Sequence, residues 1–486
     1  MRKTKQLGVA IGLVTGLLAA PGHADELSEL KAQLKAMSKR IEALQTQQKT
    51  LEGKQARAAA AQAETAAQAQ AASQAASQAA AQAQKQAAAQ PVVTASAAPV
   101  TKGKLPNSFV IPGTDTSLRI GGMARMHLAV DFDGSLGNSQ IVIGPYSDGF
   151  GGVPYNGTPQ KSRSGQLQFE ARESRLNVET LTPTAYGDLR TLIEGDFYGA
   201  GGSKLSTNSV SLRLRHAMAE LGPFLLGQYW SNFADLGQGP DVFDFGGPAG
   251  LLATNRLPQI RYTHSINDKS LASISIEQPV QDWNGANGVT FVAGGNNVSS
   301  NSIDKTPDVV ARYTYFDTWG RQSFSVAGRM LNYDTGLPRQ SDNQFGYALG
   351  YQGRFNTTGK DNLYYSAIYV NGASRYMTQI ANVSAILDGN KLDNVTGYGG
   401  NIGYQKWWSD QWRSTLNLGF SKYDIPHPNG QYRNLASETQ SVYTNLMWSP
   451  IPRALIGLEY TYARIANDNN QQGDGQRLLL ATQFSF

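Results

Sequence analysis

The segment Leu118–Asp133, with the sequence LRIGGMARMHLAVDFD, decides the fold class because its polarity alternates almost without interruption. The apolar parity consists of Leu118, Ile120, Ala124, Met126, Leu128, Val130 and Phe132. The polar parity carries Arg119, Arg125, His127, Asp131 and Asp133. Successive side chains of a β-strand point to opposite faces, so the segment predicts a strand with one apolar and one charged face. It is also longer than a typical strand of a soluble protein.

The same alternation recurs through residues 107–486 and gives about sixteen segments in all. The others are 164–180, 185–198, 208–218, 223–230, 257–265, 270–277, 309–316, 322–333, 343–355, 362–370, 395–407, 411–423, 440–449, 454–465 and 476–486. In 208–218, for example, the apolar parity consists of Val210, Leu212, Leu214 and Met218. Long Gly/Asn/Ser-rich connections, such as 134–160, 279–306 and 377–392, contrast with tight ones, such as 182–184, 317–318 and 409–410. Long alternating strands with short turns and longer loops predict an all-β fold, a transmembrane antiparallel β-barrel of about 16 strands.

The end of the chain supports a barrel rather than the alternative, a secreted β-sandwich or solenoid. Leu478, Leu480, Thr482, Phe484 and Phe486 share one parity, and the chain ends on Phe486. An aromatic last strand of this kind resembles the assembly signal of outer-membrane barrels. Aromatic residues near strand ends suit the girdles at the two membrane interfaces. The candidates are Trp230, Trp407, Trp408, Trp448, Tyr460 and Tyr462.

The composition is compatible with this fold and excludes several functions. A hydrophobic fraction of 40% and a mean hydropathy of −0.37 suit a barrel, which needs apolar residues only at alternate positions. Cysteine is absent, so no disulfide, thiolate nucleophile or cysteine metal site is expected, and no metal or other cofactor is predicted. Residues 107–486 hold 29 Lys+Arg against 31 Asp+Glu, so the net charge of +5 comes from the N-terminal part and does not indicate nucleic-acid binding.

The N-terminus predicts export. Arg2, Lys3 and Lys5 precede an apolar run from Leu7 to Ala20, and the small residues Gly22 and Ala24 follow. A basic start, a short apolar run and small residues are typical of a secretory signal peptide, assigned here to residues 1–24. The run is too short for a comfortable membrane span.

Residues 25–55 predict a coiled coil. One set of residues seven apart is Leu27, Leu34, Ile41 and Gln48, and the other is Leu30, Met37, Leu44 and Leu51. These are a and d positions over about four heptads; a single amphipathic helix is the alternative. Residues 56–106 are an Ala/Gln-rich helix or a low-complexity tether, followed by a Pro-containing linker, and both readings of the tether stay open. Because the rod precedes a barrel long enough to close, we expect it in the periplasm, where it can contact peptidoglycan or another envelope component.

If the apolar parity faces lipid, the opposite parity faces the lumen and carries many arginines. They are Arg119, Arg125, Arg190, Arg213, Arg215, Arg312, Arg329 and Arg354. Guanidinium groups grip carboxylates with paired hydrogen bonds, and a basic lumen attracts anions. The alternative is an unselective lumen in which carboxylates pair with these arginines, the candidates being Glu170, Asp188, Glu194 and Asp196.

Two places depart from the regular pattern. Segment 164–180 changes parity at Arg172-Glu173-Ser174-Arg175, which predicts either a bulge that turns both arginines inward or a strand leaving the lipid zone. The long segment 231–256 contains Asp235, Asp241 and Asp244 together with the apolar Phe243, Phe245, Leu251 and Leu252. We expect this third long loop to fold into the lumen and form the constriction.

Several stretches resemble one family. Residues 107–122 (NSFVIPGTDTSLRIGG), ARESRLN (171–177), LLGQYWSNF (225–233), RLPQIRYTH (256–264) and PDVVARYTY (307–315) are similar to the DcaP-like outer-membrane porins. The N-terminal coiled coil followed by an Ala/Gln tether is also typical of that family. The resemblance covers essentially the whole mature chain.

The resemblance implies a trimer of sixteen-stranded barrels in the bacterial outer membrane that takes up small anions, dicarboxylates in particular. Carried onto this chain, the family's basic pore corresponds to Arg119, Arg172, Arg175, Arg261 and Arg312, which lie in or at the matched stretches. The alternation itself adds Arg125, Arg190, Arg213, Arg215 and Arg329.

The remaining alternatives are a general non-selective porin, a barrel-anchored protein that tethers the envelope, and an enzyme. An outer-membrane hydrolase needs a serine beside a histidine. The mature chain has only His127, His216, His264 and His427, and no G-x-S-x-G or H-E-x-x-H motif. We therefore expect no catalytic residues and no enzymatic activity.

Overall fold

The computed structural model describes residues 101–137, 152–163, 165–203, 209–284, 301–377 and 383–486. The predicted signal peptide, the coiled coil and the Ala/Gln-rich segment lie outside the described residues. The described residues belong to one compact unit, Ala98–Phe486.

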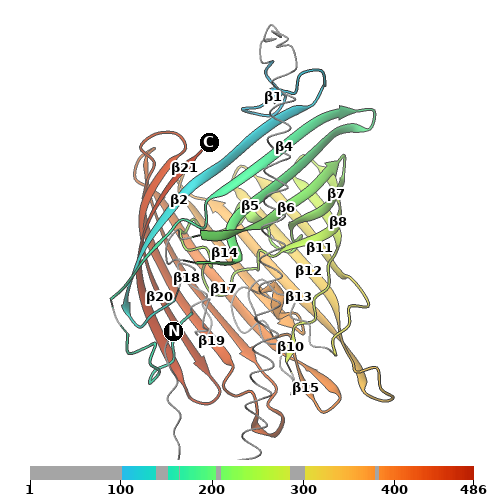
Figure 1. The fold of residues 1–486 in the computed structure, drawn as a ribbon, viewed down its shortest axis with the longest axis vertical. Helices are drawn as coiled ribbons and strands as arrows, with labels where there is room; N and C mark the ends of the chain where they lie inside the picture. Colours follow the sequence, from blue (N-terminus) through green and yellow to red (C-terminus); the bar gives the residue numbers. More distant parts are fainter. Residues whose placement is uncertain (1–100, 138–151, 164, 204–208, 285–300, 378–382) are drawn as a thin grey trace, which may run out of the picture. The chain divides into compact units, whose positions relative to one another are not determined.

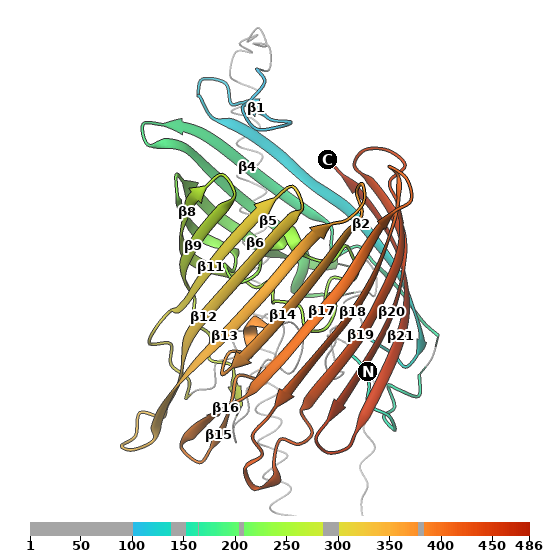
Figure 2. The ribbon, with the colours of Figure 1, turned by 180° about the vertical axis from the view of Figure 1, so that it is seen from behind.

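This unit is an antiparallel β-barrel (Figures 1 and 2). Its wall is built from β2 (Ser117–Asp133), β3 (Gln166–Glu170), β4 (Arg175–Thr184), β5 (Gly187–Ser203), β6 (Ser209–Leu221), β7 (Phe224–Trp230), β8 (Arg256–Asn267), β9 (Ser270–Glu277), β11 (Asp308–Asp317), β12 (Gly320–Asp334), β13 (Ser341–Asn356), β14 (Asn362–Asn371), β17 (Thr396–Trp407), β18 (Trp412–Asp424), β19 (Ala436–Trp448), β20 (Ala454–Asn467) and β21 (Gln472–Ser485). A two-residue strand, β1 (Phe109–Val110), pairs with the start of β2.

The wall closes on β2. One edge of β2 pairs with the last strand, β21, from Met123↔Ser485 onward. Its other edge pairs with β3 and β4, which are two parts of one interrupted strand. With that interrupted strand taken as one and β1 set aside, sixteen strands of the described residues form the closed wall, as predicted.

The two ends of the barrel differ in their connections. At one end the strands are joined by tight turns, such as those between Thr184 and Gly187 and between Asp317 and Gly320. At the other end lie the long connections, including those from β7 to β8 and from β14 to β17. Short turns mark the periplasmic end of outer-membrane barrels, so the start of β2 and the C-terminus lie at that end (Figure 1).

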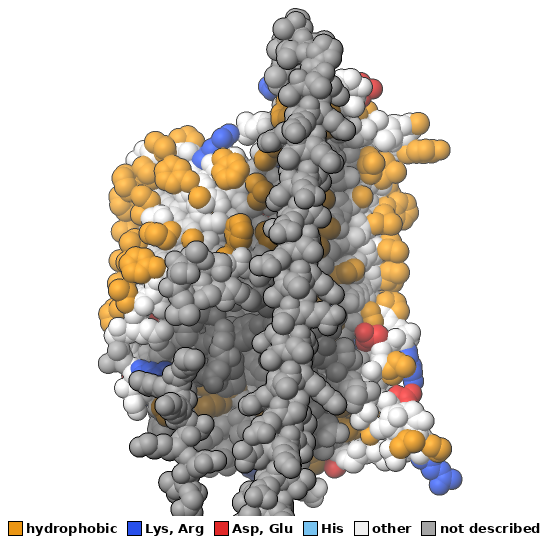
Figure 3. All heavy atoms as spheres, viewed as in Figure 1, with side chains coloured by type: hydrophobic (Ala, Val, Ile, Leu, Met, Phe, Trp, Pro, Cys, Tyr) orange, Lys and Arg blue, Asp and Glu red, His pale blue; other side chains and the backbone are white. Residues whose placement is uncertain are grey.

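The predicted alternation is confirmed by burial. On β2, Ile120 is 55% exposed and Met126 is 43% exposed, whereas His127 and Asp131 are buried. Hydrophobic side chains accordingly cover the parts of the outer wall that are visible in Figure 3. No helix among the described residues is long and apolar enough to cross a membrane.

Two predicted positions are wrong. Met218 was expected on the apolar outer face with Leu212 and Leu214, but it is buried on the lumen side beside Leu192 and Leu225. A register shift opposite Glu194 places two consecutive residues, Arg215 and His216, inward and reverses the parity beyond them. Trp230 was expected at the membrane interface, but its ring lies against Arg215 and Arg256.

The interruption between β3 and β4 falls at residues 171–174, where the sequence predicts a change of parity. The Ser174 backbone N–H donates to Ala171 O, and the Arg125 backbone N–H donates to Ser174 Oγ at 3.0 Å. The chain therefore leaves the ladder for four residues while both flanking pieces stay paired with β2.

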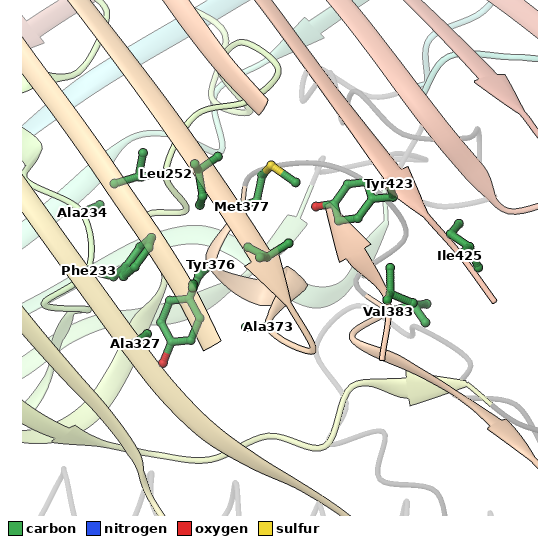
Figure 4. Packing of buried hydrophobic residues seen from close by; sticks show 14 of the residues in the cluster. Phe233, Ala234, Leu252, Ala327, Ala373, Tyr376, Met377, Val383, Tyr423 and Ile425 are labelled. Carbon is green, nitrogen blue, oxygen red and sulfur yellow. The ribbon is translucent and has the colours of Figure 1, made fainter. Parts of the chain in front are cut away.

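Several long connections turn into the barrel. The segment 231–255 runs along the inner wall and contains one short helix, η1 (Leu236–Gln238). The connection after β14 contributes η2 (Ser374–Tyr376), and its strands β15 (Ala385–Asp388) and β16 (Lys391–Asn394) form a small sheet with β10 (Trp283–Asn284). Another short helix, η3 (Pro428–Gly430), follows β18. Figure 4 shows Phe233 and Leu252 of the first connection beside Tyr376 and Met377 of the second.

Candidate functional site

The segment 231–255, named the constriction loop from here on, is held against the wall by two glutamates. Glu277, at the end of β9, accepts the Asn232 backbone N–H at 2.8 Å and the Ser231 hydroxyl at 2.7 Å. Glu459, on β20, accepts the backbone N–H groups of Phe243 at 2.7 Å and Asp244 at 2.8 Å. Both glutamates are buried. Each carboxylate thus satisfies backbone donors that would otherwise be buried without a partner.

Two of the three predicted aspartates of this loop pair with arginines of the wall, and the third is buried. The Asp235 carboxylate pairs with Arg321 at 2.6 Å, and the Asp241 carboxylate pairs with Arg413 at 2.6 Å. Asp244 is buried, and its Oδ1 accepts the Gly246 N–H at 2.7 Å. The three carboxylates therefore fasten or stiffen the loop.

The surroundings of Asp235 and Asp244 shift their acidity in opposite directions. Burial, together with the neighbouring Glu459 carboxylate, raises the pKa of Asp244 to about 8. Burial also acts to raise the pKa of Asp235, but the charges of Arg312 and Arg321 outweigh it and hold the pKa below its ordinary value. At neutral pH Asp235 is ionised, whereas Asp244 largely keeps its proton.

Two glycines allow the loop to touch the wall closely. Gly250 has a positive φ of 69°, and a Cβ there would collide with the backbone of Gly400 and Phe420. Gly457 on β20 leaves room for the Phe243 ring, which a Cβ at that position would meet. The loop is therefore seated on the backbone of β17, β18 and β20 without intervening side chains.

The opposite part of the inner wall, β2–β8, carries a cluster of arginines and carboxylates, named the arginine wall from here on. Asp196 accepts two hydrogen bonds from Arg213, at 2.9 and 2.8 Å, and one from Arg215 at 2.7 Å. Glu194 accepts from Arg215 at 2.6 Å. Most of these contacts join neighbouring strands, as cross-strand pairs on one face do.

The interruption at 171–174 adds to the same cluster. Glu173 pairs with Arg125 at 3.0 Å and with Arg175 at 3.4 Å, and Arg172 pairs with Glu170. Arg172 also lies over the ring of Tyr198, 5.0 Å from its centroid. The two arginines of the irregular segment thus join the arginine wall.

In three ion pairs of this wall the guanidinium group reaches open space and the carboxylate does not, whereas the pair of Arg215 and Glu194 is the reverse, at 1% and 16% exposure. Arg213 is 31% exposed and its partner Asp196 is fully buried. Arg175 is 25% exposed and Glu173 is 5% exposed. Arg172 and Glu170 differ in the same sense, at 21% and 4%. A solute beside these three pairs therefore meets the guanidinium groups first, because the carboxylates are buried behind them.

Three other predicted arginines lie outside this cluster. Arg119 and Arg190 both pair with Glu179 toward the periplasmic end of the barrel. Arg329 is buried and pairs with Asp282 at 2.6 Å and with Asp308 at 3.7 Å. It therefore joins β12 to the start of β11 and to the connection that follows β9.

Four arginines on the inner face of the described wall have no ion pair. Two of them, Arg261 and Arg312, were predicted: Arg261 donates to Gln259 Oε1 at 3.0 Å and Arg312 donates to Ala234 O at 2.8 Å. Of the other two, Arg354 was predicted to face the lumen, and Arg256 was not assigned to the site. Arg256 stacks on Trp230 at 4.9 Å, and its buried Nη1 has no hydrogen-bond partner.

Sequence reasoning missed the residues that hold the loop and those that bridge the lumen. Glu277 and Glu459 occupy lumen-facing positions of their strands, so the alternation predicts that their side chains point into the barrel. Their hydrogen-bond partners, however, are backbone groups far away in sequence. Tyr198 and Phe245 contact each other across the lumen with their ring centroids 5.1 Å apart. No local signal in the sequence pairs these two residues.

Two of the four histidines, His127 and His216, are structural neighbours of the cluster. His127 Nε2 accepts a hydrogen bond from Arg125 at 2.7 Å, and the ring of His216 packs against Tyr229 and Trp230. Within the described ranges, no three His, Cys, Asp or Glu side chains come together as a metal site requires.

Comparisons with known proteins place the chain in a family context. A family model described as DcaP outer membrane protein matches residues 54–486. The crystal structure of the outer membrane channel DcaP of Acinetobacter baumannii is similar, with a TM-score of 0.62 and 20% identity over 76% of this chain and 97% of that chain. OmpT, an outer membrane protein of Vibrio cholerae, matches with a TM-score of 0.46 and 10% identity over 80% and 100% of the two chains. No curated protein sequence matches.

Proposed function

The chain belongs to the DcaP outer membrane protein family, a family of outer-membrane channels, and from that premise we propose that it is a porin for diffusive uptake of small anionic solutes, dicarboxylates above all. It acts without chemistry on the solute, through the lumen of its barrel.

The observation that carries this proposal is the one-sided exposure of the arginine wall. Arg172, Arg175 and Arg213 present charged edges to the lumen, while Glu170, Glu173 and Asp196 are buried behind them. Charged groups on a low-dielectric wall act strongly on nearby ions. The wall therefore favours anions even though the barrel portion has slightly more acidic than basic residues.

The position of two guanidinium groups against one aromatic ring supports a dicarboxylate as the preferred solute. Arg172 and Arg213 both lie over the ring of Tyr198, at 5.0 and 5.2 Å from its centroid. They come from different strands and each is partly exposed. Two carboxylates of one small solute can engage one guanidinium each, by the paired hydrogen bonds that arginine forms.

The outer surface supports a homotrimer. Tyr and Trp side chains gather at the interfaces where a barrel meets lipid headgroups. The strongly exposed Tyr and Trp residues of the described strands and turns lie from β8 onward, except Tyr186 in the turn after β4. They include Tyr262, Tyr313, Tyr351, Tyr398 and Trp412. The outer faces of β2–β7 instead carry aliphatic and phenylalanine side chains such as Leu212 and Phe169, and we place the contact between subunits there because this part lacks the Tyr and Trp side chains of a lipid interface.

The junction at the start of the barrel supports a periplasmic position for the N-terminal rod. Lys102 pairs with Phe109 in a β-bridge, and the Lys104 N–H donates to Ser117 Oγ at 2.8 Å. Both contacts lie at the end with the tight turns. A rod leaving from this rim can reach peptidoglycan or another periplasmic component.

Solute flux into proteoliposomes tests the proposal. Purified protein is reconstituted, and entry is compared for a short dicarboxylate, a neutral sugar alcohol and a diamine of similar size. We expect the dicarboxylate to enter fastest. The double variant Arg172→Gln/Arg213→Gln should lose that advantage, whereas Arg464→Gln, on the outer face, should keep it.

Equal entry of all three solutes would mean a general, non-selective porin. Absence of entry for every solute, with protein correctly inserted, would favour an envelope-tethering role instead.

A further inference from the structure

Tyr198 and Phe245 form a contact between two uncharged rings in the lumen, so selectivity for charge does not explain their role. Tyr198 lies on β5, in the arginine wall, and Phe245 lies on the constriction loop. Their ring centroids are 5.1 Å apart, with planes inclined by 42°. The pair therefore spans the gap between the loop and the wall that it faces.

Phe245 is held in this position by the backbone around it. Glu459 binds the N–H groups of Phe243 and Asp244, and Tyr443 donates its hydroxyl hydrogen to Gly247 O at 3.0 Å. Arg125 donates to Phe243 O at 2.7 Å. The residues on both sides of Phe245 are thus held by hydrogen bonds. The Phe245 ring itself points away from β20, against which the loop lies.

Tyr198 is held as firmly from the other side. Its backbone N–H donates to Asp196 Oδ1 at 3.1 Å, and Asp196 is fixed by Arg213 and Arg215. Guanidinium groups lie over both rings: Arg213 is 5.2 Å from the Tyr198 centroid and 5.6 Å from that of Phe245. Cation–π contacts of this kind stabilise the closed pair.

We propose that the contact between Tyr198 and Phe245 sets the size limit of the channel, and this inference rests on the proposed porin function. A fixed aromatic contact narrows the passage from one side, so a solute must pass along the ring edges and the guanidinium groups together. Phe245 is accordingly a specificity-determining residue for solute size, and the arginines determine the charge.

Single-channel conductance and entry of neutral sugars of increasing size test this role. We expect Phe245→Ala to raise the conductance and shift the size limit to larger sugars, with the preference for anions unchanged. Phe345→Ala, which removes an exposed ring from the lipid side of β13, is the matched control and should change neither quantity.

A thiol at the same place gives an independent reading. The chain contains no cysteine, so Phe245→Cys introduces a single thiol. A bulky methanethiosulfonate reagent should then lower the conductance, while Phe345→Cys channels stay unaffected.

The inference is overturned if Phe245→Ala inserts normally and leaves both conductance and size limit at wild-type values. A cation preference in the wild-type channel would instead contradict the proposed function, and the two failures are therefore distinguishable.

Discussion

The two halves of the barrel use the same residue types for different purposes. In β2–β7, carboxylates such as Asp196 pair with arginine side chains, and the guanidinium group of Arg213 is exposed to the lumen. In β9–β20, Glu277 and Glu459 bind backbone N–H groups, and the constriction loop covers the wall. The outer faces differ as well, since exposed Tyr and Trp side chains gather from β8 onward.

The difference shows that the alternation of polarity predicts the direction of a side chain but not its hydrogen-bond or ion-pair partner. A lumen-facing glutamate neutralises an arginine where a neighbouring strand supplies one. Where a loop lies against the wall instead, the same glutamate satisfies the donors of that loop. In the proposed function, the first half of the barrel is thereby left open to solutes, and the loop that the second half holds narrows the passage.

Of the changes considered, removal of the Glu459 carboxylate that holds the constriction loop should have the largest effect on the conductance. Glu459→Ala leaves the N–H groups of Phe243 and Asp244 buried without acceptors, each at a cost of about 1–3 kcal/mol. We expect the loop to leave its seat, which single-channel recordings would register as higher and noisier conductance.

The matched control is Glu438→Ala, an outward-facing glutamate on the neighbouring strand β19, which should conduct as wild type. If Glu459→Ala channels were as quiet as wild type at the same conductance, the loop-holding role of the second half would be wrong.

Neutralising the buried carboxylate of Asp196 tests whether the arginine wall in the first half of the barrel governs the preference for anions. Asp196→Asn keeps the size of the side chain but removes the charge that Arg213 and Arg215 share. The lumen then carries more uncompensated positive charge, so the preference for anions should rise in reversal-potential measurements.

Asp410→Asn, in an exposed periplasmic turn, is the control and should leave the preference as it was. A fall in the anion preference of Asp196→Asn would show that the arginine wall does not govern selectivity.

Much of this architecture was predictable from the chain. The alternation of 118–133 and its repeats indicated the barrel, its strand number and the outward residues such as Ile120, because lipid imposes the same pattern on every strand. The parity change at 172–175 located the interruption between β3 and β4. Met218 was misplaced because a register shift at Arg215 and His216 has no local signal.

The site was predictable only in part. The arginines and the constriction loop followed from pattern and from resemblance, but the burial of Arg329 between two aspartates depends on connections folded over β12. The contacts of Glu459 with residues more than two hundred positions earlier are equally non-local. Such contacts depend on how a loop returns to a wall, which periodicity does not record.

The outer faces allow a smaller test of the same comparison. Ala124→Trp places a bulky ring on β2, where we expect a subunit contact, and should convert the trimer to smaller assemblies in detergent. Ala367→Trp makes the identical change on β14, on the side with exposed tyrosines. Size-exclusion chromatography with light scattering should show an intact trimer for Ala367→Trp, and unchanged assembly of both variants would remove the assignment of β2–β7 to the interface.

The smallest effect concerns pH. With the loop seated, Asp244 keeps its proton up to about pH 8, whereas a released loop loses it near the ordinary value for aspartate. The seated state therefore loses stability as the pH rises from the ordinary aspartate range through about 8. We expect more frequent conductance fluctuations at alkaline pH, and Asp244→Asn should abolish this dependence. An unchanged alkaline response in Asp244→Asn would assign it to another group.

The reversal potential of purified wild-type protein in a planar bilayer across a salt gradient tests the central claim most directly. An arginine wall with its carboxylates buried predicts a potential of the sign that anion preference gives, and Arg213→Gln should move it toward zero. A potential of the opposite sign would mean that carboxylates govern the lumen, and it would contradict the account.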